Sequence, residues 1–134
     1  LDNLVAYIRL WSLEYFENTP IQCKVSTPDN IPARELTGEK RRNIFLSVKE
    51  TLNNVLKHSG ASQVTIEIQA EENLLIRISD NGKGIDMENL RQFGNGLKNI
   101  ARRMESIEGT FSIVRIDSIG ENHNGTVTTL TLPV

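Results

Sequence analysis

The chain has 134 residues, of which 38% are hydrophobic, and its 15 basic and 17 acidic side chains leave a net charge of −2. This length fits one domain, residues 1–134, which buries roughly two-thirds of the surface that its unfolded chain exposes. The balanced charge excludes a general polyanion binder, so no nucleic-acid partner is expected, and the apolar content excludes a disordered tail. No apolar run approaches the roughly 20 residues of a membrane span. The single cysteine, Cys23, excludes an internal disulfide and a zinc site built from cysteines.

The first predicted element is a helix over residues 2–16, where apolar residues recur at helical spacing until Thr19-Pro20 ends the pattern. The chain starts at Leu1 rather than at Met, inside this helix and without a signal peptide, so we expect a segment cut from a longer protein. A short strand is predicted over residues 21–25, and a loop rich in turn-forming residues follows over 26–32.

The longest predicted element is a helix over residues 38–58. Thr37 precedes it and Glu39 stands in its first turn, which is typical of a helix N-terminus. Gly60 is suited to the left-handed conformation that ends many helices. The apolar stripe expected to face the core consists of Phe45, Val48, Leu52, Val55 and Leu56.

The second half of the chain predicts mostly strands. Residues 63–69 and 74–79 alternate apolar and polar side chains, and the short turn between them predicts a hairpin. The later elements are a glycine-rich segment over 80–96, a helix over 97–107 ended by Gly109, a strand over 110–116, a polar loop over 117–125 and a strand over 126–132. This order predicts an α/β (α+β) two-layer sandwich with a mixed, mostly antiparallel sheet covered by helices. The hairpin argues against a purely parallel sheet.

Asp80 follows the second strand of the hairpin in phase with its apolar residues Leu74, Ile76 and Ile78. Side chains alternate along a strand, so the carboxylate is expected on the apolar side, where a buried charge needs a partner. One interpretation is a hydrogen bond to a ligand donor such as an adenine amino group. The other is that Asp-Asn-Gly opens an ordinary turn.

Two glycine pairs flank a polar loop. Gly82 and Gly84 allow the backbone to adopt a positive φ and to approach a ligand closely. Gly94 and Gly96 stand just before a predicted helix, whose free N-terminal amides would bind phosphate. Each pair alone mostly indicates turns. Two pairs around one loop favour a lid over a nucleotide.

The helix over residues 38–58 carries a polar row. Glu50, Asn54 and His58 stand at i, i+4 and i+8 and share one face, opposite the apolar stripe. An oxygen of Asn54 or Glu50 suits a hard cation such as Mg²⁺, whereas the alternative is a solvated polar face. Taken alone, His58 suits a surface or capping role, and Lys57 suits a lysine that complements the helix dipole.

Taken together, these segments resemble the ATP-binding domain of histidine kinases in order and spacing. The resemblance is close over residues 41–134 and extends to residues 1–40 in pattern only. The short lid and the Asn-x-x-Lys-His ending are similar to those of the nitrate-sensor and membrane-fluidity-sensor kinases. The matching segments are 50–58 (ETLNNVLKH, N box), 80–85 (DNGKGI, G1 box), 94–100 (GNGLKNI, G2 box) and the final strand with Gly125-Thr126, Thr129 and Leu132-Pro133.

The resemblance implies the Bergerat α/β sandwich, shared with gyrase, the Hsp90 chaperone and mismatch-repair ATPases, and ATP and Mg²⁺ as its ligands. Asn54 would ligate Mg²⁺, Glu50 would help to activate the attacking group or a water, and Asp80 would accept a hydrogen bond from the adenine amino group. The other implied contacts are Lys57 near the phosphates, His58 near the ribose or base, Thr129 at a water-bridged base contact, Gly82 and Gly84 in the adenine pocket, and Gly94, Gly96 and Leu97 around the phosphates.

The implied function is that of the Mg-ATP-binding catalytic domain of a two-component sensor histidine kinase. The γ-phosphoryl would pass to a histidine on a separate dimerisation domain and then to the receiver domain of a response regulator. Residues 1–40 contain no histidine, His58 belongs to the N box and His123 to a polar loop, so this segment alone should bind ATP without phosphorylating itself. The resemblance further implies a homodimeric full-length protein anchored in a bacterial inner membrane, with this domain cytoplasmic and without membrane contact of its own.

Other functions remain open at this point. The sequence contains neither a Walker A motif nor a Gly-x-Ser-x-Gly motif, which excludes a P-loop and disfavours a serine hydrolase. An anti-sigma-factor-type serine kinase would share the fold. A degenerate, nucleotide-free interaction module would have lost ligand residues, whereas Asn54, Asp80 and the glycines are present. A plain structural α/β domain would require three motifs in order by chance.

Overall fold

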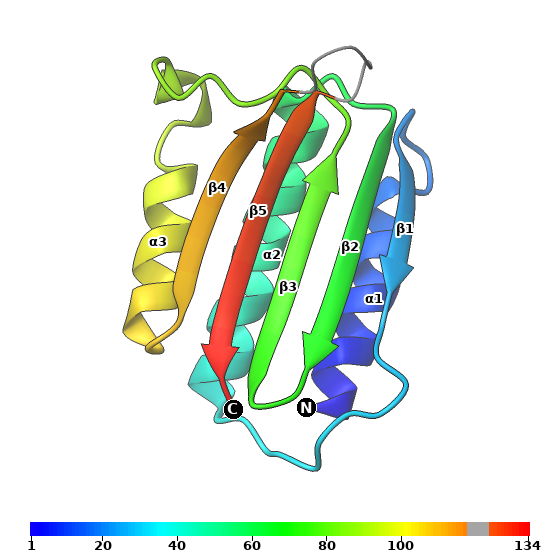
Figure 1. Cartoon of the computed structure of the whole chain (residues 1–134), viewed down its shortest axis with the longest axis vertical. Coiled ribbons are helices and arrows are strands. Elements are labelled where there is room, and N and C mark those ends of the chain that lie inside the picture. Colours follow the sequence, from blue (N-terminus) through cyan, green and yellow to red (C-terminus); the bar gives the residue numbers. More distant parts are fainter. Residues whose placement is uncertain (118–123) are drawn as a thin grey trace.

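The computed structural model describes residues 1–117 and 124–134 and has two layers (Figure 1). One layer is a five-stranded sheet in the order β1-β2-β3-β5-β4. The helices cover one face of this sheet. β1 pairs in parallel with β2, and the other neighbouring strands pair antiparallel. The predicted mixed, mostly antiparallel sandwich is therefore confirmed, whereas most of the predicted polar loop, including His123, lies outside the described residues.

The helical layer consists of α1 (Asp2–Phe16), α2 (Gly38–His58) and α3 (Gly96–Ser106), with α2 in the middle, α1 behind β1 and β2, and α3 beside β4 (Figure 1). The predicted bounds of α2 are confirmed: Thr37 accepts a hydrogen bond from the Lys40 N–H (3.2 Å), and Gly60 adopts a φ of 64° just beyond the end. After α3, Glu108 adopts the left-handed conformation (φ 62°), one residue before the Gly109 that was expected to end the helix.

The strands fall within about one residue of their predicted bounds, and a short 3₁₀ helix, η1, interrupts the loop before α3. In β2, β3 and β5, alternate side chains are buried under the helices. The elements are β1 (Gln22–Ser26), β2 (Gln63–Ala70), β3 (Asn73–Asp80), η1 (Leu90–Phe93), β4 (Thr110–Ile116) and β5 (Gly125–Pro133).

The core lies between α2 and the central strands. Its fully buried side chains include Ile8, Ile44, Val48, Leu52, Ile66, Ile76, Leu130 and Leu132. The predicted stripe of α2 is rotated slightly: Phe45 and Leu56 are only partly buried, whereas Ser47 and Thr51 are buried. The latter two hydroxyls donate to backbone carbonyls one turn earlier, which satisfies them inside the core.

Because neighbouring side chains of β3 lie on opposite faces of the sheet, shortening them should have unequal effects on stability. Ile76 is fully buried, whereas Leu75 lies on the outer face. Ile76→Ala is expected to lower the free energy of unfolding by about 2–5 kcal/mol, because it leaves a cavity in the core. The matched control Leu75→Ala deletes the same number of carbons and should cost roughly 1 kcal/mol or less. Urea denaturation measures both, and equal losses would contradict the assigned faces.

Candidate functional site

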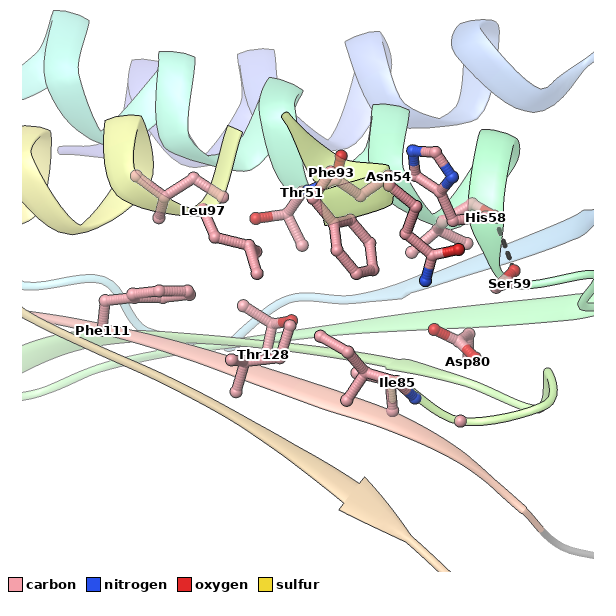
Figure 2. A pocket seen from close by; sticks show the side chains of 16 residues that line it. Thr51, Asn54, His58, Ser59, Asp80, Ile85, Phe93, Leu97, Phe111 and Thr128 are labelled. Atoms are coloured by element: carbon pink, nitrogen blue, oxygen red, sulfur yellow. Dashed lines mark hydrogen bonds between the residues drawn. The ribbon is translucent and has the colours of Figure 1, made fainter. Parts of the chain in front are cut away.

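A pocket lies between α2 and the sheet, and η1 and the start of α3 close its side (Figure 2). Its walls are mostly apolar, from Ile85, Phe93, Leu97 and Phe111, and its polar end contains Asn54, Asp80 and His58. The free volume is only about 30 Å³, which is roughly the room that one water needs. Ligand pockets typically offer several hundred cubic ångströms, so a ligand of ordinary size requires the walls of this pocket to move apart.

Asp80 stands where β3 ends, with its carboxylate on the pocket side, as predicted from its phase (Figure 2). Its Oδ1 accepts a hydrogen bond from the Gly82 N–H (2.9 Å), so the residue also opens a turn. Burial raises the pKa of Asp80 above its ordinary value, and hydrogen bonds from the backbones of Gly82 and Thr126 partly oppose this. Both interpretations of this residue are thus compatible with one geometry.

The polar row of α2 faces the pocket in part. Asn54 and His58 line it, whereas Lys57 is exposed and does not. The His58 ring meets the Phe93 ring edge-on, with 4.8 Å between centroids. Desolvation lowers the pKa of His58, and the charges of Lys57 and Lys83 add to this effect, so the imidazole is neutral at pH 7.

Glu50 meets the start of α3. A Cβ added at Gly96 would collide with Glu50 Oε1 and would lie 3.6 Å from Asn54 Oδ1. Glycine at this position thus lets the N-terminus of α3 approach these two side-chain oxygens without displacing the Glu50 carboxylate. No side chain caps this helix at Asn95, which leaves its first-turn amides without a side-chain acceptor from the cap residue. The structure thereby brings together Glu50, Asn54, Gly96 and Leu97, which sequence analysis singled out separately.

The other glycines singled out from the sequence meet different structural requirements. Gly84 adopts a positive φ of 86°, as expected, and lines the pocket, and Gly94 also adopts a positive φ, of 57°. Gly82 does not have a positive φ: a Cβ there would run into the carbonyl oxygen of Ser59, at the end of α2. The Lys83 N–H donates to that same oxygen (2.9 Å). Gly82 is therefore required by close packing of the turn against α2.

The β5 hydroxyl that was predicted to contact the base, that of Thr129, lies on the face of the sheet opposite the pocket. Thr129 pairs with Arg77 and Ser112 on the outer side of the sheet, away from the pocket. Thr126 and Thr128 line the pocket instead, because side chains alternate along a strand. The Thr126 hydroxyl accepts a hydrogen bond from the Ile85 N–H (2.8 Å), which ties the start of residues 85–95, the predicted lid segment, to β5. Alternation within β5 contained the signal that identifies these two residues.

The side-chain oxygens that could bind a metal ion together lie beside the N-terminus of α3. Within residues 1–117 and 124–134, no three histidine, cysteine or acidic side chains converge as a metal cluster. Mg²⁺ in nucleotide sites needs only one or two protein oxygens, because phosphates and waters complete its shell. Asn54 Oδ1 and Glu50 Oε1, both beside the N-terminus of α3, fit that requirement.

None of the helices in the described part of the chain is both long enough and apolar enough to cross a bilayer.

Comparisons with known proteins agree with this geometry. Residues 39–134 match the family model of histidine kinase-, DNA gyrase B- and HSP90-like ATPases. Over 79 residues, the chain is 40% identical to the sensor protein VraS of Staphylococcus saprophyticus and 38% identical to VraS of Staphylococcus epidermidis. Each match covers 58% of this chain and 23% of the relative, so the chain spans about a quarter of these curated relatives.

Solved structures show the same fold. The histidine kinase domain of the Erythrobacter litoralis EL346 blue-light activated histidine kinase has a TM-score of 0.75 at 20% identity, over 97% of this chain and 64% of that one. The Acinetobacter baumannii histidine kinase AdeS has a TM-score of 0.71 at 17% identity, over 96% and 64%.

The pKa of Asp80 predicts how stability depends on pH. Because the folded pKa lies above the unfolded value, the folded state holds more protons between the two, and stability falls as pH rises through that window. Asp80→Asn keeps an acceptor for the Gly82 N–H and removes this fall, so the variant should be at least as stable as the parent at pH 7. Denaturation at several pH values measures this. A variant that is less stable at every pH would mean that the hydrogen bonds to the carboxylate outweigh its desolvation.

Proposed function

Because the chain belongs to the family of histidine kinase-, DNA gyrase B- and HSP90-like ATPases, we propose that it is the Mg-ATP-binding catalytic domain of a sensor histidine kinase. The observation that carries this proposal is the convergence of three separate segments on one pocket. Asp80 reaches it from β3, Asn54 from α2, and the uncapped N-terminus of α3 begins at Gly96 beside Glu50. These are an acceptor for a base, a metal ligand and a phosphate-binding helix terminus.

The base would bind at the sheet end of the pocket. Asp80 accepts a hydrogen bond from the adenine amino group, and Thr126 and Thr128 supply hydroxyls on the same wall. Ile85 and Phe111 provide apolar surface for the ring. His58, neutral and in contact with Phe93, lies on the α2 side, where a ribose or base edge would pass.

The phosphates would extend toward the N-terminus of α3. Its free amides and helix dipole favour negative charge there. Bound Mg²⁺ supplies charge neutralisation and alignment of the phosphates. Asn54 offers it an oxygen, and Glu50 is placed to orient or deprotonate the attacking group. Lys57, exposed beside His58, would approach the phosphates from the solvent side.

The acceptor and partners complete the proposal. We assign the phosphoryl acceptor to a histidine on a separate dimerisation domain, and the next acceptor to the receiver domain of a response regulator. The relatives at 40% and 38% identity are named sensor proteins, which favours this assignment over an anti-sigma-factor-type serine kinase. The whole protein would be a homodimer anchored in a bacterial inner membrane, with this domain in the cytoplasm.

Calorimetric titration with ATP and ADP tests the nucleotide site. The chain should bind both, and Asp80→Asn should weaken binding by about tenfold or more, because a charge-assisted hydrogen bond is lost. Asp86→Asn is the matched control, since Asp86 is an exposed carboxylate of the lid segment. No heat at millimolar nucleotide would favour a nucleotide-free interaction module. Equal affinity of parent and Asp80→Asn would reject the role of this carboxylate.

A second titration tests the metal ligand. Asn54→Ala should remove most of the affinity that Mg²⁺ adds, by roughly tenfold, and should leave metal-free ATP binding nearly unchanged. Asn53→Ala is the control, because Asn53 faces α1 and accepts a hydrogen bond from Tyr15 (3.2 Å). Equal losses with and without Mg²⁺ in Asn54→Ala would assign this residue to the nucleotide itself.

A further inference from the structure

The helical layer carries a row of aromatic side chains between α1 and α2. The chain has four phenylalanines, two tyrosines and one tryptophan, and four of these seven form this row. Phe45 of α2 lies 5.0 Å from Tyr7 and 5.5 Å from Trp11, and Trp11 stacks on Tyr15 at 4.8 Å between ring centroids. We call Tyr7, Trp11, Tyr15 and Phe45 the aromatic seam.

The aromatic seam lies at the surface and is partly open to solvent, while Trp11, Tyr15 and Phe45 are half-buried against the core. Tyr7 is 52% exposed, and Leu10, one turn further along α1, is 54% exposed. The surface is hollowed at both ends of the seam: a groove of about 530 Å³ contains Tyr7 and Phe45, and one of about 370 Å³ contains Tyr15 and Glu50. Exposed apolar side chains beside surface hollows are typical of interaction sites.

Basic side chains border the seam. Arg41 and Arg42 line the first groove, and Lys49 lines the second, with its ammonium 6.0 Å from the centre of the Trp11 ring. All three are exposed. Tyrosine, tryptophan and arginine are the residue types that contribute most to protein–protein binding. The charge of the border favours a partner with carboxylates.

The size and shape of the seam fit a helix. Neighbouring helices leave a groove into which the side chains of a third helix pack. From Arg41 to Asn53, α2 advances 12 residues, or about 18 Å, which equals three to four turns of a partner helix. These dimensions and this charge suit an amphipathic helix with carboxylates beside its apolar stripe.

We propose that the aromatic seam binds such an acidic amphipathic helix of a partner domain. One end of the seam reaches the groove that contains Glu50, whose carboxylate abuts the N-terminus of α3. The docked helix therefore ends beside the phosphate side of the site. Assigning the helix to the histidine-bearing domain rests on the proposed function, whereas the docking itself does not. Most of the seam lies on α1, outside the residues 39–134 that match the family.

Trp11 makes the test direct, because it is the sole tryptophan of the chain. The probe is a tryptophan-free synthetic helical peptide of about 20 residues, with a leucine stripe flanked by glutamates. Its matched counterpart has lysines in place of the glutamates. The acidic peptide should change Trp11 fluorescence saturably, and the lysine peptide should bind about tenfold more weakly, because the basic border repels it.

Two charge reversals on exposed positions separate docking from misfolding. Arg42→Glu should weaken binding of the acidic peptide about tenfold and strengthen binding of the lysine peptide. Lys24→Glu changes the net charge equally but lies on the outer face of β1, so it should change neither affinity by more than about twofold.

Three results would overturn the docking proposal: unchanged Trp11 fluorescence, equal binding of both peptides, or a fluorescence change on phosphatidylglycerol vesicles without one on the acidic peptide. The last result would mean a membrane surface instead of a helix. Nucleotide titrations on the same samples keep the two proposals apart. Lost peptide binding with intact ATP binding rejects only the docking, and the reverse result rejects only the nucleotide site.

Discussion

The rotational setting of α2 about its own axis is the constraint on which the rest of the molecule depends. Ile44, Val48 and Leu52 are fully buried against the sheet, so the helix cannot turn without leaving a cavity in the core. That same setting aims Asn54 into the pocket and brings Phe45 into contact with α1. The packing of α2 against the sheet thereby positions both the pocket-facing residues and the outer aromatic surface.

Close backbone approaches then fix the loops to this helix and to the sheet. A Cβ at Gly82 would meet the Ser59 carbonyl, one at Gly96 would meet Glu50, and one at Gly125 would meet the Asp80 backbone. At Gly82 and Gly125 the obstacle is a backbone carbonyl oxygen, so a larger residue would not fit unless the backbone moved. At Gly96 the obstacle is the end of the Glu50 side chain, which would have to turn away. The shape of the polar end of the pocket therefore depends on these glycine positions as well as on the Asp80 carboxylate and the Asn54 amide that face it.

Sequence analysis predicted what local periodicity and capping determine. The bounds of α2, the alternation of β2 and β3 and the inward phase of Asp80 all follow from such patterns. The motif resemblance predicted that Thr129 contacts the base, but alternation along β5 places Thr126 and Thr128, and not Thr129, at the pocket. The sequence analysis followed the motif position instead of this alternation. It also missed Phe93, whose contact with His58 depends on how the loop folds over the pocket, and no periodicity encodes that.

Because the free volume of the pocket is small, the affinity for a nucleotide is expected to depend on how easily the lid segment opens. Ile85 is buried and tied to Thr126, which anchors one end of the segment, while Met87 and Leu90 further along are 52% and 37% exposed. A segment with so few buried contacts opens at low cost. A nucleotide that binds only the open form sees its intrinsic affinity reduced by the open fraction. Under the proposed function, the free energy needed to move Phe93 away from His58 is therefore expected to lower nucleotide affinity below what contacts with Asp80 and Asn54 alone would give.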